Sequence, residues 1–133
     1  MKIIGFNLDK TCYGLPLDNG GACLIVDGKV EMMVSEERLN RKQYSAGYNL
    51  SILYILYNCD LKISDIDLFV ASSCLEPRRT PEYVSQELRK FGFDVPVSKI
   101  EIADHHLAHA YGAYYPSGFN SSIVMILDGD GNV

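Results

Sequence analysis

Residues 22–35 read ACLIVDGKVEMMVS, and this stretch decides how the 133-residue chain begins to fold. Two apolar runs, residues 22–26 and 30–35, are separated by Asp27-Gly28, and an Asp-Gly pair in this position is the strongest short-range signal for a β-hairpin. The apolar run at residues 2–8, with two neighbouring isoleucines, predicts a strand before the hairpin. We therefore expect a three-stranded antiparallel piece at the start of the chain, with a long first loop.

After this opening, strands and helices are expected to alternate. The charged run at residues 35–42 is interpreted as a solvated surface turn. The later predicted elements are, in chain order, a helix within 44–59, a strand at 68–72, a helix at 81–91, an edge strand at 97–102, a helix at 104–115 and a buried strand at 122–127. This order predicts an α/β fold with a mixed sheet covered by helices.

The helix within residues 44–59 carries apolar residues three and four positions apart, which is typical of an amphipathic helix facing a core. We assign this stripe to packing and not to ligand binding. Its members are Tyr48, Ile52, Leu53, Leu56 and Tyr57.

The composition is that of a soluble globular domain, with 47% hydrophobic residues, 22% charged residues and a net charge of -5. This charge provides no basic field that would attract nucleic acid or an anionic membrane. The apolar runs are too short to span a bilayer. The four cysteines are irregularly spaced and the amino terminus does not read as a secretion signal, so we expect a cytoplasmic protein with reduced thiols.

All three histidines lie within the run DHHLAHA, residues 104–110. In a helix capped by Asp104, His105 and His109 project from the same face one turn apart, which is the spacing that two imidazoles need to share a metal ion. The helix dipole near its start disfavours imidazolium and so favours the neutral ligand form. A third donor is required, and Asp128 or Asp130 would supply it. Iron, manganese or zinc would suit such a site, and a structural role for each histidine is the alternative.

The sequence Asp128-Gly129-Asp130-Gly131 has two interpretations. It is either a plain turn or a phosphate-binding turn, in which glycines let backbone N–H groups approach an anion. The earlier run DNGG at residues 18–21 would be the matching turn near the start of the chain.

These motifs together resemble a known family. The run 104–110, followed by AYYPSGF at 113–119 and LDGDG at 127–131, is similar to the nodulation and antibiotic-type O-carbamoyltransferases. Three earlier segments also match the family. Its first hairpin resembles Asp27-Gly28, the exit from that hairpin resembles the run EER at 36–38 with Arg41-Lys42, and its next strand resembles Ile66-Asp67. The resemblance implies the first lobe of an actin, sugar kinase and heat-shock ATPase type fold. Residues 1–118 would form that lobe, and residues 119–133 the first strand and phosphate turn of a second lobe.

The resemblance also implies an activity. ATP and carbamoyl phosphate would give carbamoyl adenylate, and the carbamoyl group would pass to a hydroxyl of a small-molecule acceptor. A divalent metal, with iron the implied ion, would be held by His105, His109 and Asp128. The residues implied at the nucleotide phosphates are Gly129, Asp130, Gly131, Arg41 and Lys42.

The family's adenylate-forming domain and most of its second lobe have no counterpart in these 133 residues. We therefore expect little or no transferase activity from them alone, because one wall cannot preorganise a site that lies between two lobes. Two alternatives stay open. One is a free-standing metal-binding module or small metallohydrolase built on His105, His109 and a carboxylate. The other is a noncatalytic interaction domain that self-associates through an exposed last strand.

Overall fold

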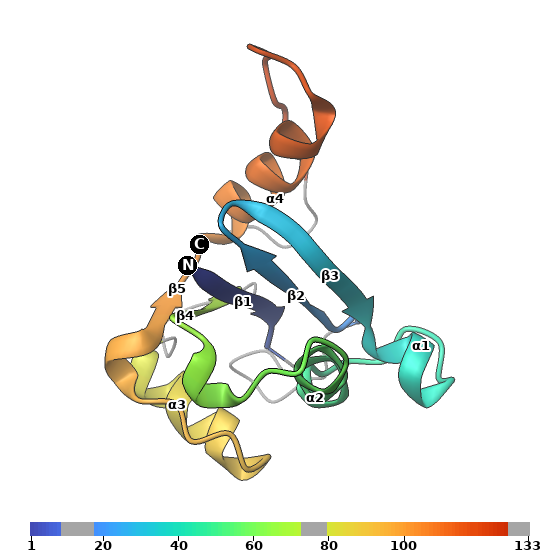
Figure 1. The fold of residues 1–133 in the computed structure, drawn as a ribbon. Helices are drawn as coiled ribbons and strands as arrows, with labels where there is room; N and C mark the ends of the chain where they lie inside the picture. The colour runs from blue at the N-terminus through green and yellow to red at the C-terminus, as the bar shows by residue number, and fades with distance from the viewer. Residues whose placement is uncertain (9–17, 73–79, 128–133) are drawn as a thin grey trace.

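A five-stranded mixed sheet with strand order β3-β2-β1-β4-β5 forms the centre of the fold (Figure 1). The computed structural model describes residues 1–8, 18–72 and 80–127, and all structural statements below concern these residues. The strands pair antiparallel from β1 to β2 and from β2 to β3, whereas β4 is parallel to both β1 and β5. Their bounds are β1 Lys2–Asn7, β2 Gly21–Val26, β3 Lys29–Ser35, β4 Leu68–Ser72 and β5 Ile100–Ile102.

The hairpin between β2 and β3 forms where the Asp-Gly pair predicts it. Asp27 has φ of 50° and Gly28 has φ of 81°, and Val26 pairs with Lys29 across the turn. Two successive left-handed residues match the right-handed twist of the flanking strands, which is why Asp-Gly suits a two-residue loop. The predicted three-stranded antiparallel opening is therefore confirmed.

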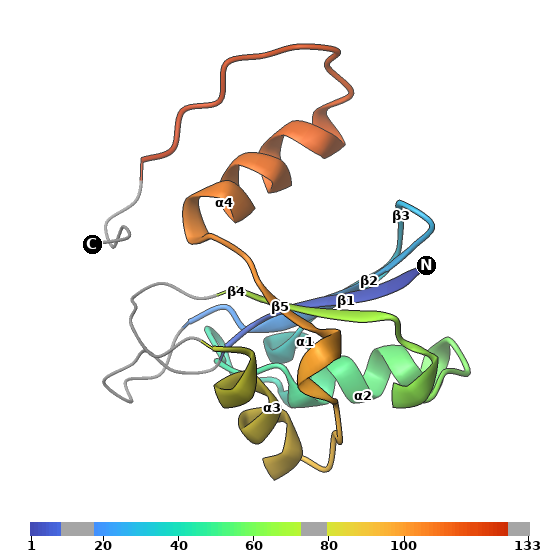
Figure 2. The same ribbon diagram turned by 90° about the vertical axis from the view of Figure 1, so that its left-hand side faces the viewer.

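Helices lie on both sides of this sheet (Figure 2). In that view α2 and α3 lie against one face, and α4 lies beyond the opposite face. The α-helices are α1 Glu36–Asn40, α2 Asn49–Asn58, α3 Pro81–Lys90 and α4 His105–Tyr114. Short 3-10 helices follow at η1 Ile63–Asp65, η2 Val97–Lys99 and η3 Tyr115–Ser117. The predicted class, an α/β mixed sheet of the kind expected of a single lobe, is confirmed.

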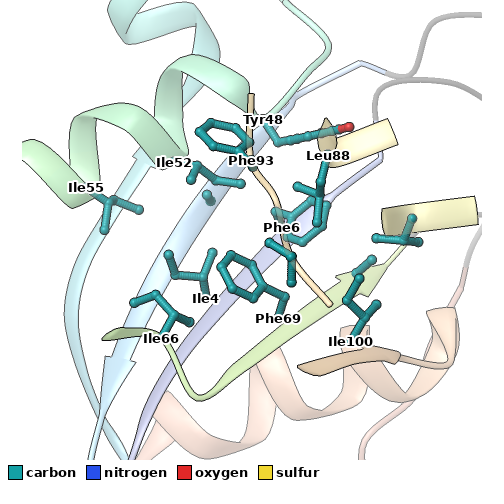
Figure 3. Packing of buried hydrophobic residues seen from close by; sticks show 14 of the residues in the cluster. Ile4, Phe6, Tyr48, Ile52, Ile55, Ile66, Phe69, Leu88, Phe93 and Ile100 are labelled. Carbon is teal, nitrogen blue, oxygen red and sulfur yellow. The ribbon is translucent and has the colours of Figure 1, made fainter. Parts of the chain in front are cut away.

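The hydrophobic core lies between the sheet and the helices α2 and α3 (Figure 3). Alternate residues of β1 and β4 point into it, as the two-residue period of a strand requires. Burial of each large apolar side chain contributes about 1.5–3 kcal/mol. Fully buried members include Ile4, Leu24, Ile52, Ile55, Ile66, Phe69, Val84 and Leu88.

The predicted core face of α2 is partly wrong. Tyr48 and Ile52 are fully buried and Leu56 is 7% exposed, but Leu53 is 49% and Tyr57 86% exposed. A helix that packs on a sheet buries one stripe of its surface, and these two residues follow Ile52 and Leu56 by about 100° around the helix, which takes them off that stripe. The helix is also shorter than the predicted segment, since it begins at Asn49 and ends at Asn58.

Two further predicted segments differ from the structure. The charged run at 35–42 is not a solvated turn, because it contains α1 and because Glu36 is only 2% exposed. The predicted strand at 97–102 is a strand only at Ile100–Ile102, because the Lys99 N–H donates to the Pro96 carbonyl and closes a 3-10 turn. As predicted, β5 lies at the sheet edge.

Residues 122–127 do not form the predicted buried strand. They have no regular secondary structure, and Ile123 is 99% and Leu127 87% exposed. The physical reason is that a strand needs a neighbouring strand for its backbone hydrogen bonds, whereas this segment runs back along the side of α4 that lies away from the sheet (Figure 2). Among the described helices none has the length and apolarity that crossing a membrane requires.

Candidate functional site

The helix α4 begins where Asp104 was predicted to cap it. The Asp104 carboxylate accepts a hydrogen bond from the Leu107 N–H at 2.9 Å, and helical geometry starts at His105. Asp104 thereby satisfies one of the backbone donors that a helix start leaves without an intrahelical partner. The cap fixes the register of the helix and so fixes which histidines share a face.

His105 and His109 meet on one face of α4, as their spacing predicts. Their Nε2 atoms lie 3.3 Å apart, and their ring centroids are separated by 4.5 Å in an edge-to-face arrangement. His106 is further from His105, with ring centroids 5.7 Å apart. The structure therefore brings together the two predicted ligands, and the third histidine lies less close to His105 than His109 does.

The separation of the two nitrogens fits a shared metal ion. Two imidazole nitrogens at about 2.05 Å from a tetrahedral ion are about 3.3 Å apart. The same separation also suits a hydrogen bond between a donor tautomer and an acceptor tautomer. Imidazole nitrogens bind zinc, manganese and iron, so the distance between the two nitrogens supports a shared metal ion without distinguishing among these metals.

The third predicted ligand, Asp128, lies outside the described residues, as do Gly129, Asp130 and Gly131. The last described residue, Leu127, lines a small pocket of about 220 Å³ together with His109, Ala113 and Val124. The residue before Asp128 therefore lies on the same pocket as one of the histidines. No group of three or more His, Cys, Asp or Glu side chains within the described ranges is placed to hold a metal ion.

A second candidate site lies around α1, at the exit from β3. A hollow of about 470 Å³ is lined by both arginines of this segment and by Asn19, together with Glu37, Gln43 and Tyr44. An adjoining hollow of about 540 Å³ shares Asn19 and Arg38 with the first and extends over the start of β2 to β1. We call the two together the arginine groove.

The arginine groove carries a local excess of positive charge. Arg38 is largely exposed, and its guanidinium group lies 3.6 Å from a carboxylate oxygen of Glu37. Arg41 ends α1 in the left-handed region with φ of 62°, and its N–H donates to the Glu37 carbonyl. The two guanidinium groups present fork-shaped donors that suit a phosphate or carboxylate.

Sequence reasoning identified only part of this groove. Arg41 lines it, as its predicted phosphate-binding role would require, but Lys42 does not, and the Lys42 backbone N–H donates to the Asn40 side chain. Asn19 belongs to the run at 18–21 that was predicted as the matching turn, whereas Arg38 was missed. The available signal was the three-residue spacing of Arg38 and Arg41, which places both on one side if the charged run is helical.

The fold and the two sites define an α/β protein with an open mixed sheet and with a histidine pair on the helix that follows β5. No protein-family model matches the chain. In sequence it is similar to the nodulation protein NolNO of Sinorhizobium fredii, with 32% identity over 136 aligned residues. The alignment covers 87% of this chain and 20% of NolNO, so the chain spans about a fifth of the length of that relative. The predicted resemblance to a nodulation protein is confirmed by this relationship.

Proposed function

We propose that this chain is the first lobe of an O-carbamoyltransferase of the nodulation type, which acts together with further lobes and domains of the enzyme. Residues 1–118 would form the lobe, and residues 119–133 would begin the next. The observation that carries the proposal is the His105–His109 pair, whose Nε2 atoms are 3.3 Å apart. The pair lies in a chain that is 32% identical to a nodulation protein over 87% of this chain.

The surface around α4 supports the assignment to a larger domain. No residue of α4 is buried, although Leu107 and Tyr111 are apolar or aromatic and are about half exposed. The following segment adds Ile123, Met125 and Leu127, each at least 78% exposed. Contiguous exposed apolar surface of this kind is typical of a face that another part of a protein covers.

Each site would have a distinct role in the complete enzyme. His105 and His109, with Asp128, would hold a divalent metal ion, for which the resemblance favours iron and the donor set also suits zinc or manganese. A bound metal ion would supply Lewis-acid polarisation of a phosphate or carbonyl oxygen. Arg38 and Arg41 would bind and orient phosphate groups of ATP or carbamoyl phosphate through bidentate hydrogen bonds.

The reaction that this assembly would serve is transfer of a carbamoyl group to a hydroxyl of a small-molecule acceptor. Carbamoyl phosphate would supply the carbamoyl group and ATP the adenylyl group. Hydrolytic loss of phosphate would give carbamate, carbamate and ATP would give carbamoyl adenylate and pyrophosphate, and attack by the acceptor hydroxyl would form the carbamoyl ester and release AMP. The role of this lobe would be to orient the donor and to exclude water beside it, which converts an encounter between two reactants into a reaction at fixed geometry. Because residues 1–133 would form only one wall of such a site, they should show little or no turnover alone.

A metal titration with matched variants tests the histidine pair. Fe(II) or Zn(II) binding to the purified chain is measured by calorimetry for the wild type and for His105→Ala, His109→Ala and His106→Ala. We expect the first two substitutions to abolish binding, and His106→Ala to retain it because the His106 ring lies further from His105 than the His109 ring does, at 5.7 Å against 4.5 Å between centroids. Equal loss in all three variants, or equal retention, would contradict the assignment.

The activity test uses the same chain with ATP and carbamoyl phosphate, and follows carbamoyl transfer to a panel of small hydroxyl acceptors. Robust turnover by residues 1–133 would contradict the proposal that one lobe is insufficient. Tight stoichiometric metal binding by residues 1–133, in place of the weaker binding expected of an incomplete ligand set, would instead favour a self-sufficient metal-binding module. Light scattering separates the remaining alternative, since a strictly monomeric chain would argue against self-association through residues 122–127.

A further inference from the structure

A buried carboxylate connects the arginine groove to the rest of the lobe. Glu36 is the only buried residue of α1 and is 2% exposed. Burying a charged group is costly unless it is hydrogen-bonded, so a carboxylate in this position requires specific donors. We propose that Glu36 is a positioning residue for the arginine groove, an inference that rests on the proposed role of that groove in binding phosphate.

The donors come from the start of α2. The Glu36 Oε1 atom accepts hydrogen bonds from the Ser51 N–H at 2.7 Å and from the Ser51 hydroxyl at 2.8 Å. The N-cap residue of α2, Tyr48, makes no side-chain cap hydrogen bond, so the third N–H of this helix is satisfied by Glu36 from another element. A negative charge at a helix N-terminus also interacts favourably with the helix dipole.

The backbone of Glu36 makes a second attachment. Its N–H donates to the Gly20 carbonyl at 2.9 Å, and the Gly20 N–H donates in turn to the Ser45 carbonyl at 2.8 Å. The space beside Gly20 is closed by the Gly47 backbone. Glu36 therefore connects the start of β2, the loop at 45–48 and the start of α2.

These attachments determine where the guanidinium groups lie. α1 has only five residues, and a helix this short is not stable by itself. Arg38 follows Glu36 by two residues, and Gly20 and Gly21 line the same groove as Arg38. Without its buried anchor α1 would lose its fixed orientation, and both arginines would lose their preorganised position.

A variant series separates positioning from charge. Removing a buried negative charge near two arginines should strengthen anion binding if only charge matters. Positioning predicts the reverse for Glu36→Ala, namely weaker binding of the probe, inorganic pyrophosphate, by about tenfold or more, since hydrogen bonds to a charged group are lost. Glu36→Gln retains an acceptor oxygen for Ser51 and should restore most of the affinity.

The experiment measures pyrophosphate affinity by nuclear magnetic resonance titration of the arginine Nε–H signals, and amide hydrogen exchange over residues 37–41. We expect Glu36→Ala to weaken binding and to speed exchange in that segment, with the sheet amides unchanged. Unchanged or tighter binding in Glu36→Ala, in a chain where Arg38→Ala weakens binding, would overturn the positioning role. Ser51→Ala removes only one of the two donors to Glu36, so it replaces Glu36→Ala if that variant does not fold. It should weaken pyrophosphate binding and speed amide exchange by a smaller amount. Unchanged binding and unchanged exchange in Ser51→Ala would overturn the positioning role of Glu36.

Failure of the proposed function gives a different result. If pyrophosphate does not bind the wild type, or binds Arg38→Ala equally well, the groove is not an anion site and its proposed function fails. Hydrogen exchange then tests the anchor by itself. Faster exchange of residues 37–41 in Glu36→Ala would still show that Glu36 holds α1, whereas unchanged exchange would show that it does not.

Discussion

Replacing Gly20 with alanine should destabilise this chain far more than one added methyl group ordinarily does. A Cβ at Gly20 would lie 2.2 Å from the carbonyl oxygen of Gly47 and 2.4 Å from its backbone nitrogen. Both are main-chain atoms, which no change of side-chain rotamer can move aside. Gly20 is itself held on two sides, by the Ser45 carbonyl and by the Glu36 N–H.

The size of the effect follows from this geometry. Overpacking of a well-packed interior costs about 1–3 kcal/mol. Because the added Cβ of Gly20→Ala would clash with two backbone atoms of Gly47, we expect its cost at or above the upper end of this range. With a urea m value of about 1.5 kcal/mol/M, a loss of about 3 kcal/mol lowers the unfolding midpoint by about 2 M. The assay is urea unfolding followed by circular dichroism.

The matched control is Gly112→Ala in α4, where an added Cβ meets nothing within 4 Å. Alanine is preferred over glycine inside a helix by about 0.5–1 kcal/mol, so this variant should be as stable as the wild type or slightly more stable. A Gly20→Ala midpoint within about 0.3 M of the wild type would refute the reasoning, because it would mean that the Gly47 backbone is not fixed against Gly20.

Three further predictions concern the core, a helix cap and a thiol. Phe69→Ala should lower the free energy of unfolding by about 3–5 kcal/mol because the Phe69 side chain is fully buried. The control Tyr57→Ala should change it by less than about 0.5 kcal/mol because Tyr57 is 86% exposed. Similar urea midpoints for the two variants would contradict the core assignment. Thr80→Ala should cost about 1 kcal/mol because the hydroxyl accepts the Tyr83 N–H at the start of α3, and Thr80→Ser should retain the stability in the same assay. Burial raises the pKa of the Cys23 thiol, so carboxymethylation at pH 8, followed by peptide mass mapping, should be slower at Cys23 than for a free thiol, and an equal rate would count against its burial.

Part of the candidate site could be predicted because its geometry is local. The four-residue spacing of His105 and His109 places both rings on one helical face wherever that helix lies, and the cap that starts the helix at Asp104 is three residues from its donor. The placement of Asp128 could not be predicted in the same way, because its position relative to the histidines depends on the chain between them. It stays a prediction, since Asp128 lies outside the described residues.

The arginine groove shows the opposite case. The charged run at 35–42 has no apolar periodicity, so its sequence favoured a solvated turn. Glu36 is buried only because the start of α2, fifteen residues later, offers the Ser51 N–H and hydroxyl to it. No local pattern reveals a donor that distant, and the helix that carries Arg38 was therefore missed.

The sequence by itself determined the elements whose causes lie within a few residues: the Asp27-Gly28 hairpin, the caps of α3 and α4, and the shared face of the histidine pair. Tertiary structure decided which side of α2 is buried, the burial of Glu36 against Ser51, and the failure of residues 122–127 to form a strand. The physical reason is the range of the forces involved. Turn and cap preferences act between neighbours, whereas burial and strand pairing depend on partners that only the assembled fold supplies.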